Sequence, residues 1–183
     1  MKVTLSHVPR IAQRIAIELN KSGLVTMTRG LDPVAHEAEK ILEESVKKEH
    51  ALEERVNEML AENEDNIEDM LADERQLFFM IKKKLAPEYG VILSYEERYS
   101  DLSHKILDEL YEEDLINYEV TENRIKNVIY NAITGYIASN DEIDDAVMEK
   151  IRSYKRRIIP GTEEFDIIHE KLYNEELQKR GLA

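Results

Sequence analysis

The chain has 183 residues, no cysteine and a formal net charge of −14, from 39 acidic and 25 basic side chains. The missing cysteines exclude disulfides, thiolate zinc sites and a cysteine nucleophile, and the acidity opposes non-specific binding to nucleic acids. No run of about 18 apolar residues is present, so the sequence predicts no membrane span. His7, Arg10 and Arg14 interrupt the first segment too often for a signal peptide, and we therefore expect a cytoplasmic protein.

The first half of the sequence predicts a helix, a short extended link and then a long helical region. Apolar side chains at helical spacing predict the first helix over residues 3–21, and Gly23 ends it. Asp32 and Pro33 mark the start of the helical region, which contains no further Gly or Pro before Pro87. This length permits one very long helix, but the pattern of the second half predicts two breaks in it. The breaks are expected near residues 47–50 and 63–66, giving helices over residues 33–47, 50–62 and 66–85.

The second half of the sequence predicts the same order of elements. A helix over residues 96–112 is followed by an extended link and by a helix over residues 122–138. The polar residues 139–141 predict a break before a helix over residues 142–154. Thr162 then predicts the N-cap of a last helix, because its side chain can accept a hydrogen bond from a free backbone amide.

Apolar positions in the two halves coincide when the sequence is shifted by 91 residues. Ile11, Ile15 and Leu19, for example, fall on Leu102, Ile106 and Leu110. We therefore predict an all-α protein of two tandem repeats, each a unit of roughly four helices, with domains at residues 1–91 and 92–183. The extended links contain β-favouring residues, so they are expected to pair as a minimal two-stranded ribbon. These links are residues 24–27 and 115–120.

Three segments of the second half resemble a known bacterial family. They read LSHKILDELYEEDLI (residues 102–116), DEIDDAVMEKIRSYKR (residues 141–156) and IPGTEEFDIIHEKLYNEELQKRG (residues 159–181). In this order they are similar to the family called domain of unknown function 507 (DUF507), whose shorter members contain one such unit. The resemblance implies a bacterial, cytoplasmic and mostly helical protein, here as a tandem two-copy version. The family has no assigned reaction or ligand, so the resemblance adds no functional residue.

Two pairs of side chains have the spacing of metal ligands on a helix. Asp101 and His104, and likewise Asp166 and His169, lie three residues apart and therefore on one helical face. Carboxylate and histidine pairs of this kind hold di-iron sites in helical bundles, but those sites use Glu and need two further inward acids. Solvated or locally hydrogen-bonded side chains are the favoured interpretation, and we expect no metal and no cofactor.

A cluster of cations precedes the last predicted helix. Beside the free amides of that helix, these cations are a candidate site for a phosphate or a nucleic acid, although the net charge of the chain disfavours a nucleic-acid partner. The simpler interpretation is a solvated face whose cations pair with neighbouring acids. The cluster consists of Lys150, Arg152, Lys155, Arg156 and Arg157, with Lys82, Lys83 and Lys84 as further candidates.

Phe78, Phe79 and Met80 are followed by Ile81, and a helix cannot bury four consecutive apolar residues on one stripe. Phe78, Phe79 and Met80 are therefore the candidate protein interface, unless the contact between the two repeats covers them. The sequence contains no glycine-rich phosphate loop, no HExxH pair and no nucleophile elbow. We expect a non-catalytic interaction or scaffolding module that binds a protein partner or itself, with phosphate or nucleic-acid binding as the alternative and a metal site third.

Overall fold

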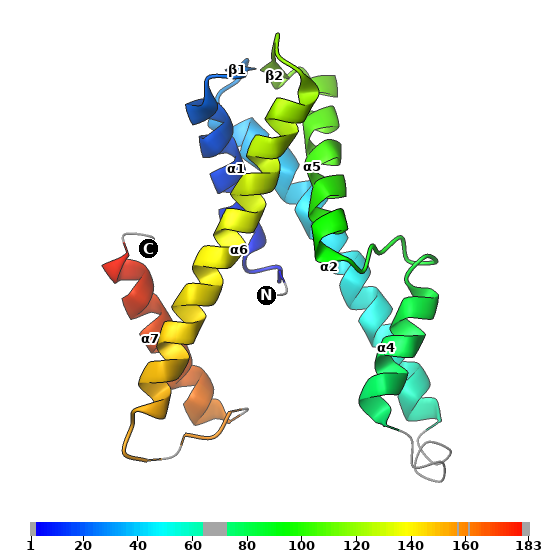
Figure 1. Cartoon of the computed structure of the whole chain (residues 1–183), viewed down its shortest axis with the longest axis vertical. Helices are drawn as coiled ribbons and strands as arrows, with labels where there is room; N and C mark the ends of the chain where they lie inside the picture. Colours follow the sequence, from blue (N-terminus) through cyan, green and yellow to red (C-terminus); the bar gives the residue numbers. More distant parts are fainter. Residues whose placement is uncertain (1–2, 64–72, 157, 161, 181–183) are drawn as a thin grey trace. The chain divides into compact units, whose positions relative to one another are not determined.

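The computed structural model describes residues 3–63, 73–156, 158–160 and 162–180 (Figure 1). The described residues form helices and one small pair of strands, which confirms the predicted all-α class. In chain order the elements are α1 (Val8–Ser22), β1 (Thr26–Met27), α2 (Leu31–Glu62), α4 (Glu74–Leu85), α5 (Tyr95–Glu112), β2 (Ile116–Asn117), α6 (Glu122–Arg152) and α7 (Glu163–Lys179). Among them, no helix combines the length and the apolar character needed to cross a membrane.

The chain divides into two compact units. The first unit holds residues 2–134, and the second holds residues 135–183. The predicted domain boundary between residues 91 and 92 falls inside the first unit, and the two-domain division stays a prediction. Helix α6 continues from one unit into the other.

Helix α2 is uninterrupted, so the predicted break near residues 47–50 is wrong. Two ion pairs stabilise the helix near these residues, and in each pair the partners lie one helical turn apart. The Lys47 amine lies 2.8 Å from the Glu43 carboxylate, and the Lys48 amine lies 2.6 Å from the Glu44 carboxylate. The helix ends at Glu62, where the second break is predicted. Of the helix predicted over residues 66–85, the structure describes α4, and residues 64–72 lie outside the described part.

Helix α6 also continues through residues 139–141, where the sequence predicts a break. Ser and Asn favour helix ends because their side chains can form hydrogen bonds with the local backbone, and these bonds replace the backbone hydrogen bonds of the helix. Here the Ser139 hydroxyl donates to the carbonyl of Gly135 within the helix at 2.9 Å, and the buried Asn140 side chain accepts a hydrogen bond from the hydroxyl of Tyr173 on α7. Both polar groups are satisfied without ending the helix. The predicted N-cap is confirmed, since the Thr162 side chain accepts from the amide of Phe165.

The predicted two-stranded ribbon is confirmed. Strands β1 and β2 pair antiparallel, with Thr26 opposite Asn117 and Met27 opposite Ile116. As predicted, Gly23 ends α1, and it has a left-handed backbone with φ of 65°. The ribbon therefore joins the α1–α2 connection to the α5–α6 connection within the first unit.

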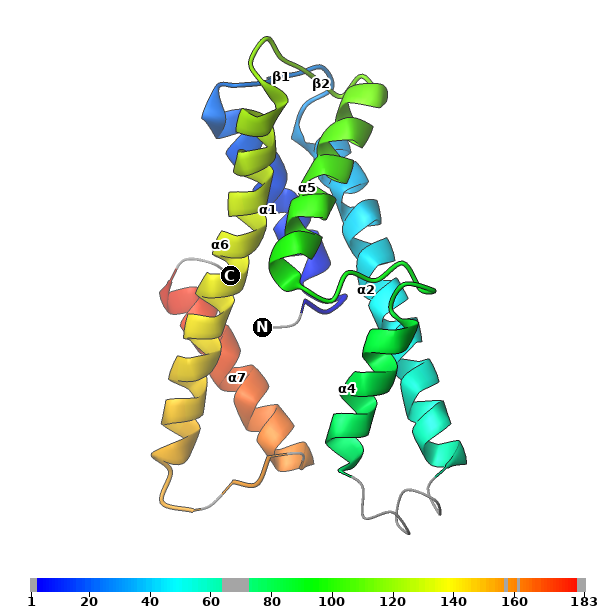
Figure 2. The same cartoon turned by 45° about the vertical axis from the view of Figure 1, so that its right-hand side comes forward.

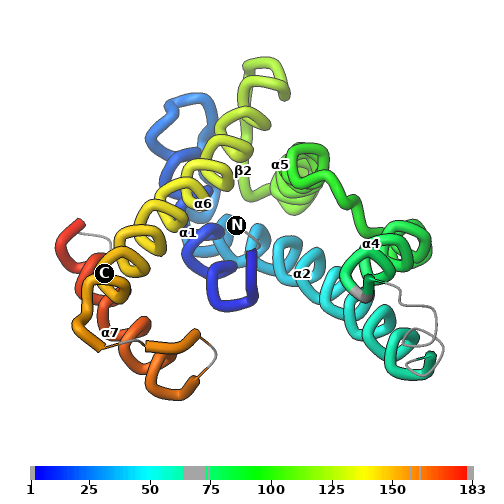
Figure 3. Tube along the Cα trace, turned by 60° about the horizontal axis from the view of Figure 1, so that its bottom comes forward, coloured from blue at the N-terminus to red at the C-terminus, as the bar shows by residue number. Residues whose placement is uncertain are grey.

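Each unit has its own apolar contacts. In the first unit, α4 lies along the C-terminal half of α2 (Figure 2), and the side chains between them include Leu52, Val56, Leu60, Leu77, Phe78 and Ile81. In the second unit, α7 lies beside the C-terminal half of α6 (Figure 3). Its core consists of Ile143, Val147, Ile151, Ile158, Leu172 and Leu177.

The buried positions of the two halves coincide at the predicted shift of 91 residues. All six buried positions of α1 fall on buried positions of α5, and all seven of α2 fall on buried positions of α6. The match includes polar residues, because Glu49 falls on Asn140. The α1 and α5 positions are Val8, Ile11, Ala12, Ile15, Ala16 and Leu19 against Tyr99, Leu102, Ser103, Ile106, Leu107 and Leu110. The α2 and α6 positions are Val34, Ala38, Leu42, Glu49, Leu52, Val56 and Leu60 against Ile125, Ile129, Ile133, Asn140, Ile143, Val147 and Ile151.

Candidate functional site

A buried group of charges, the three-helix joint, links α2, α4 and α5 in the first unit. Glu49 of α2 is 3% exposed and accepts from Arg98 Nη1 of α5 at 2.6 Å and from Lys82 Nζ of α4 at 3.0 Å. Lys82 also lies 2.7 Å from Glu53, and Arg98 Nε donates to the carbonyl of Ile92 at 2.7 Å. One carboxylate thus connects three helices.

The groups of the three-helix joint stabilise one another in their charged forms. Burial acts to raise the pKa of Glu49, but the hydrogen bonds from Arg98 and Lys82 outweigh it and hold that pKa below its ordinary value. Burial acts to lower the pKa of Lys82, whereas its hydrogen bonds to Glu53 and Glu49 raise it overall. A carboxylate that stays ionised at neutral pH is a poor general acid. The joint therefore serves to position α4 and α5 against α2.

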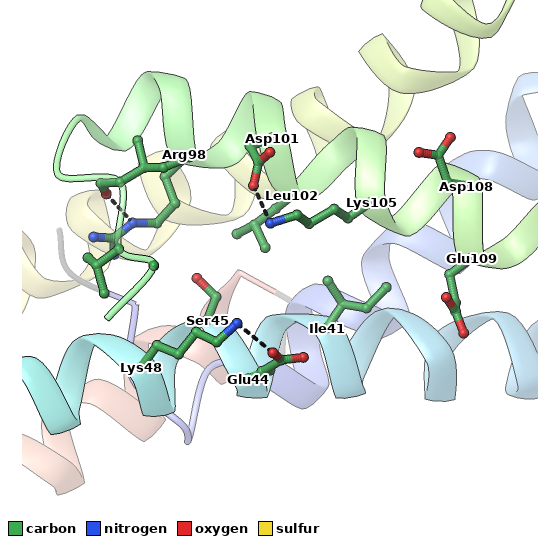
Figure 4. A pocket seen from close by; sticks show the side chains of 13 residues that line it. Ile41, Glu44, Ser45, Lys48, Arg98, Asp101, Leu102, Lys105, Asp108 and Glu109 are labelled. Atoms are coloured by element: carbon green, nitrogen blue, oxygen red, sulfur yellow. Dashed lines mark hydrogen bonds and ion pairs between the residues drawn. The ribbon is translucent and has the colours of Figure 1, made fainter. Parts of the chain in front are cut away.

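A cleft of about 390 Å³ lies between α2 and α5, next to Arg98 (Figure 4). Its facing walls carry two ion pairs, Lys48 with Glu44 on α2 at 2.6 Å and Lys105 with Asp101 on α5 at 2.7 Å. Each lysine bonds an acid on its own helix, and the hydrogen bond from Lys48 lowers the pKa of Glu44. The cleft therefore presents fixed charges that are already paired, which does not indicate a particular ligand.

The predicted metal pairs have other partners in the structure. Asp101 pairs with Lys105, and His104 is exposed. His169 Nε2 lies 2.8 Å from a carboxylate oxygen of Asp144 on α6, while Asp166 is exposed. Within the described ranges, no three His, Asp or Glu side chains gather as a metal site would require. Each pair therefore supplies at most two ligands.

The cation cluster before α7 is partly engaged by acids of the second unit. Lys150 bonds Glu176, and Arg156 bonds Glu164. Arg152 and Lys155 are exposed, and Arg157 lies outside the described residues. Two of the predicted cations, Lys150 and Arg156, are thus paired with acids of the same unit.

The outer face of α4 combines apolar and cationic side chains, although the chain as a whole is acidic. It consists of the exposed residues Arg75, Gln76, Phe79, Met80, Lys83 and Lys84. Phe79 is 56% exposed and Met80 is 67% exposed, whereas Phe78 and Ile81 pack into the α2–α4 core. The sequence predicted that the four consecutive apolar residues could not all be buried on one stripe, but it did not predict which are exposed. Of the three candidate interface residues, Phe79 and Met80 are exposed, whereas Phe78 packs into the core. The face thus combines two large apolar side chains with three cations and, among these six residues, no acid.

Sequence analysis missed the three-helix joint. Glu49 occupies a position of the apolar stripe that Leu42, Leu52 and Val56 define on α2, and this is the signal that could have found it. An acid inside such a stripe requires a cation partner from another element. Local spacing does not show that the partners are Lys82 and Arg98.

The chain matches the model of a family described as a protein of unknown function (DUF507) over residues 1–182. A comparison with curated proteins gives no match. The resemblance that the sequence shows in residues 92–183 thus extends over both halves, and it supplies no reaction, ligand or partner.

Proposed function

Because the chain belongs to the DUF507 family of proteins of unknown function, we propose its function from its surfaces: it is a non-catalytic helical module that binds a protein partner through the outer face of α4. The observation that carries this proposal is the exposure of Phe79 and Met80 among three cations. An exposed apolar patch rimmed by polar groups is typical of an interaction site.

We propose an acidic amphipathic helix as the partner, because this face combines exposed apolar and cationic side chains. Phe79 and Met80 are both exposed, and burying such a side chain contributes about 1.5–3 kcal/mol. Arg75 and Lys83 lie one turn before and after Phe79, so acidic side chains on both flanks of an apolar stripe would complement them.

The structure of the first unit preorganises this face. The opposite side of α4 packs on Leu52, Val56 and Leu60 of α2, and Lys82 is held by Glu49 and Glu53. A partner therefore binds a helix that is already ordered, which lowers the entropic cost of binding.

A direct test uses a synthetic stapled helix with a leucine stripe flanked by glutamates as the probe. In fluorescence anisotropy, the double variant F79A/M80A should bind this probe at least about tenfold more weakly than the wild type, because truncating interface anchors costs more than about 1 kcal/mol each. The matched control is Tyr111→Ala, which removes a comparably exposed ring from α5 and should leave binding unchanged.

Two results would contradict the proposal. The first is equal binding of the probe to wild type and F79A/M80A. The second is the absence of probe binding together with binding to vesicles of anionic lipid, since a cationic and apolar helix face is also typical of a membrane surface. That second result would assign the face to lipid.

The cation cluster at residues 150–157 is the alternative surface, for a phosphate or a nucleic acid. Its engagement by Glu164 and Glu176 favours the α4 face over it.

We also infer that the two halves arose by tandem duplication of one helical unit in a bacterial, cytoplasmic protein. The described order α1, β1, α2, α4 matches α5, β2, α6, α7, and the starts of α2 and α6 lie 91 residues apart. A polar pair occupies equivalent positions in both halves, Glu49 with Lys82 and Asn140 with Tyr173. The coincidence of the buried positions supports the same inference. The described part of each half contains three helices, where the sequence predicts about four.

A further inference from the structure

The outer face of α7 is acidic where that of α4 is basic. Its exposed stripe contains Glu163, Ile167 and Glu170, and Ile167 is 61% exposed. The neighbouring exposed residues are Glu164, Asp166, Lys171, Asn174 and Glu175, so acids predominate over a single lysine. The buried side of α7 packs on α6 through Leu172 and Leu177. The outer face therefore has the acidic, apolar character that the α4 face requires of its partner.

We infer that the helix bound by the outer face of α4 is the outer face of α7 from a second copy of this chain. This inference rests on the proposed function, because it names the partner of the same face.

The two faces match in spacing as well as in charge. On α4, Phe79 lies between Arg75 and Lys83, which are about 12 Å apart along the helix axis at 1.5 Å per residue. On α7, Ile167 lies between Glu163 and Glu170, which are about 10.5 Å apart by the same rise. When the two helices lie side by side, Phe79 can therefore contact Ile167. In the same arrangement, each of the two cations on α4 lies next to one of the two acids on α7.

The equivalence of the two helices strengthens the argument. Each is the last described helix of its half, and the shift of 91 residues places Arg75 on Asp166 and Lys84 on Glu175. At these two positions the halves carry opposite charges. Contacts between two α4 faces or between two α7 faces would place like charges together, so the pattern favours α4 against α7.

The net charge of −14 does not prevent such a contact. At physiological ionic strength the Debye length is about 8 Å, so the charges inside the contact dominate over the distant ones. Another ring with acidic neighbours, Tyr111, is a weaker candidate because it packs against Tyr118, with the ring centroids 5.3 Å apart. A contact between two different faces produces either a closed assembly, of which a reciprocal dimer is the smallest, or an open series of copies.

The test is sedimentation equilibrium of the full-length chain over a range of concentrations. The wild type should associate, and the charge reversals R75E/K83E and E163K/E170K should each weaken association about tenfold or more, since each reversal replaces an attraction by a repulsion. The quadruple variant with all four reversals should associate as the wild type does. Arg124→Glu and Glu119→Lys, which reverse exposed charges elsewhere, are the controls and should have no effect.

Three outcomes would overturn the inference. They are a chain that is monomeric at every concentration, association that neither reversal weakens, and a quadruple variant that folds but does not recover the association of the wild type. Circular dichroism confirms folding, and R75Q/K83Q replaces R75E/K83E if the reversal reduces the helix content. If the chain is monomeric but still binds the stapled probe through Phe79 and Met80, this inference fails and the proposed function stands. If probe binding is absent too, both fail.

Discussion

Glu49→Ala should lower the free energy of unfolding of the first unit by about 3–5 kcal/mol, because removing one partner of a buried ion pair leaves the other charge uncompensated. Arg98 is 7% exposed, and its Nη2 atom has no hydrogen-bond partner in the described part of the chain. Without Glu49 its Nη1 atom would also lose its acceptor, while Lys82 would keep Glu53. The attachments of α4 and α5 to α2 would weaken together.

Denaturant unfolding followed by circular dichroism measures this effect. The control is Glu54→Ala on the same helix, where an exposed acid lies 3.6 Å from His50 and its loss should change stability by less than about 0.5 kcal/mol. A loss below about 1 kcal/mol for Glu49→Ala would show that the three-helix joint is not needed for stability.

The dependence of stability on pH gives an independent measurement of the same carboxylate. The pKa of Glu49 in the folded protein lies below its ordinary value of 4.5, so the stability it contributes is fully present above that value. This contribution is lost as the pH falls through the lowered pKa. The stability difference between wild type and Glu49→Gln should therefore be largest near neutral pH and should shrink below pH 4.5. A difference that stays constant to lower pH would contradict the assignment.

Leu172→Ala should detach α7 from α6 at a cost of about 2–5 kcal/mol, the usual range for truncating a buried leucine to alanine. The apolar cluster between α6 and α7 contains six buried side chains in the described residues, and Leu172 is one of two that α7 contributes. A small core gives a small free energy of unfolding, so the loss of one buried leucine removes a large share of it. We therefore expect α7 to unfold locally, with the helices of the first unit intact.

Hydrogen exchange read by mass spectrometry separates these regions. In Leu172→Ala the amides of α7 should lose protection, whereas those of α1 and α5 should keep it. Ile167→Ala removes an exposed side chain from the same helix and should leave protection unchanged. Simultaneous loss of protection in α7 and α1 would show that the two units unfold as one.

The sequence predicted features that depend on local pattern. The ribbon, the N-cap at Thr162 and the end of α1 at Gly23 all follow from residue type and helical period. Each of these requires information from only a few neighbouring residues.

The wrong break at residues 139–141 and the missed three-helix joint both involve partners far away in the sequence. Asn140 is a residue type that favours helix ends, but here Tyr173, 33 residues later, donates a hydrogen bond to its side chain within the helix. The position of Glu49 in the apolar stripe of α2 indicates a buried acid, but only the fold shows that Arg98, 49 residues later, pairs with it. Such long-range polar contacts are invisible to local spacing, and they decide where a helix continues and which charge is buried.

The ribbon has a consequence for synthesis on the ribosome. Thr26 pairs with Asn117, so β1 emerges long before its partner exists. Helices α1 and α2 can pack while the rest is still being translated, because they are neighbours in the sequence. For that interval the nascent chain carries an unpaired strand edge, which a chaperone or a second nascent chain could occupy before β2 arrives.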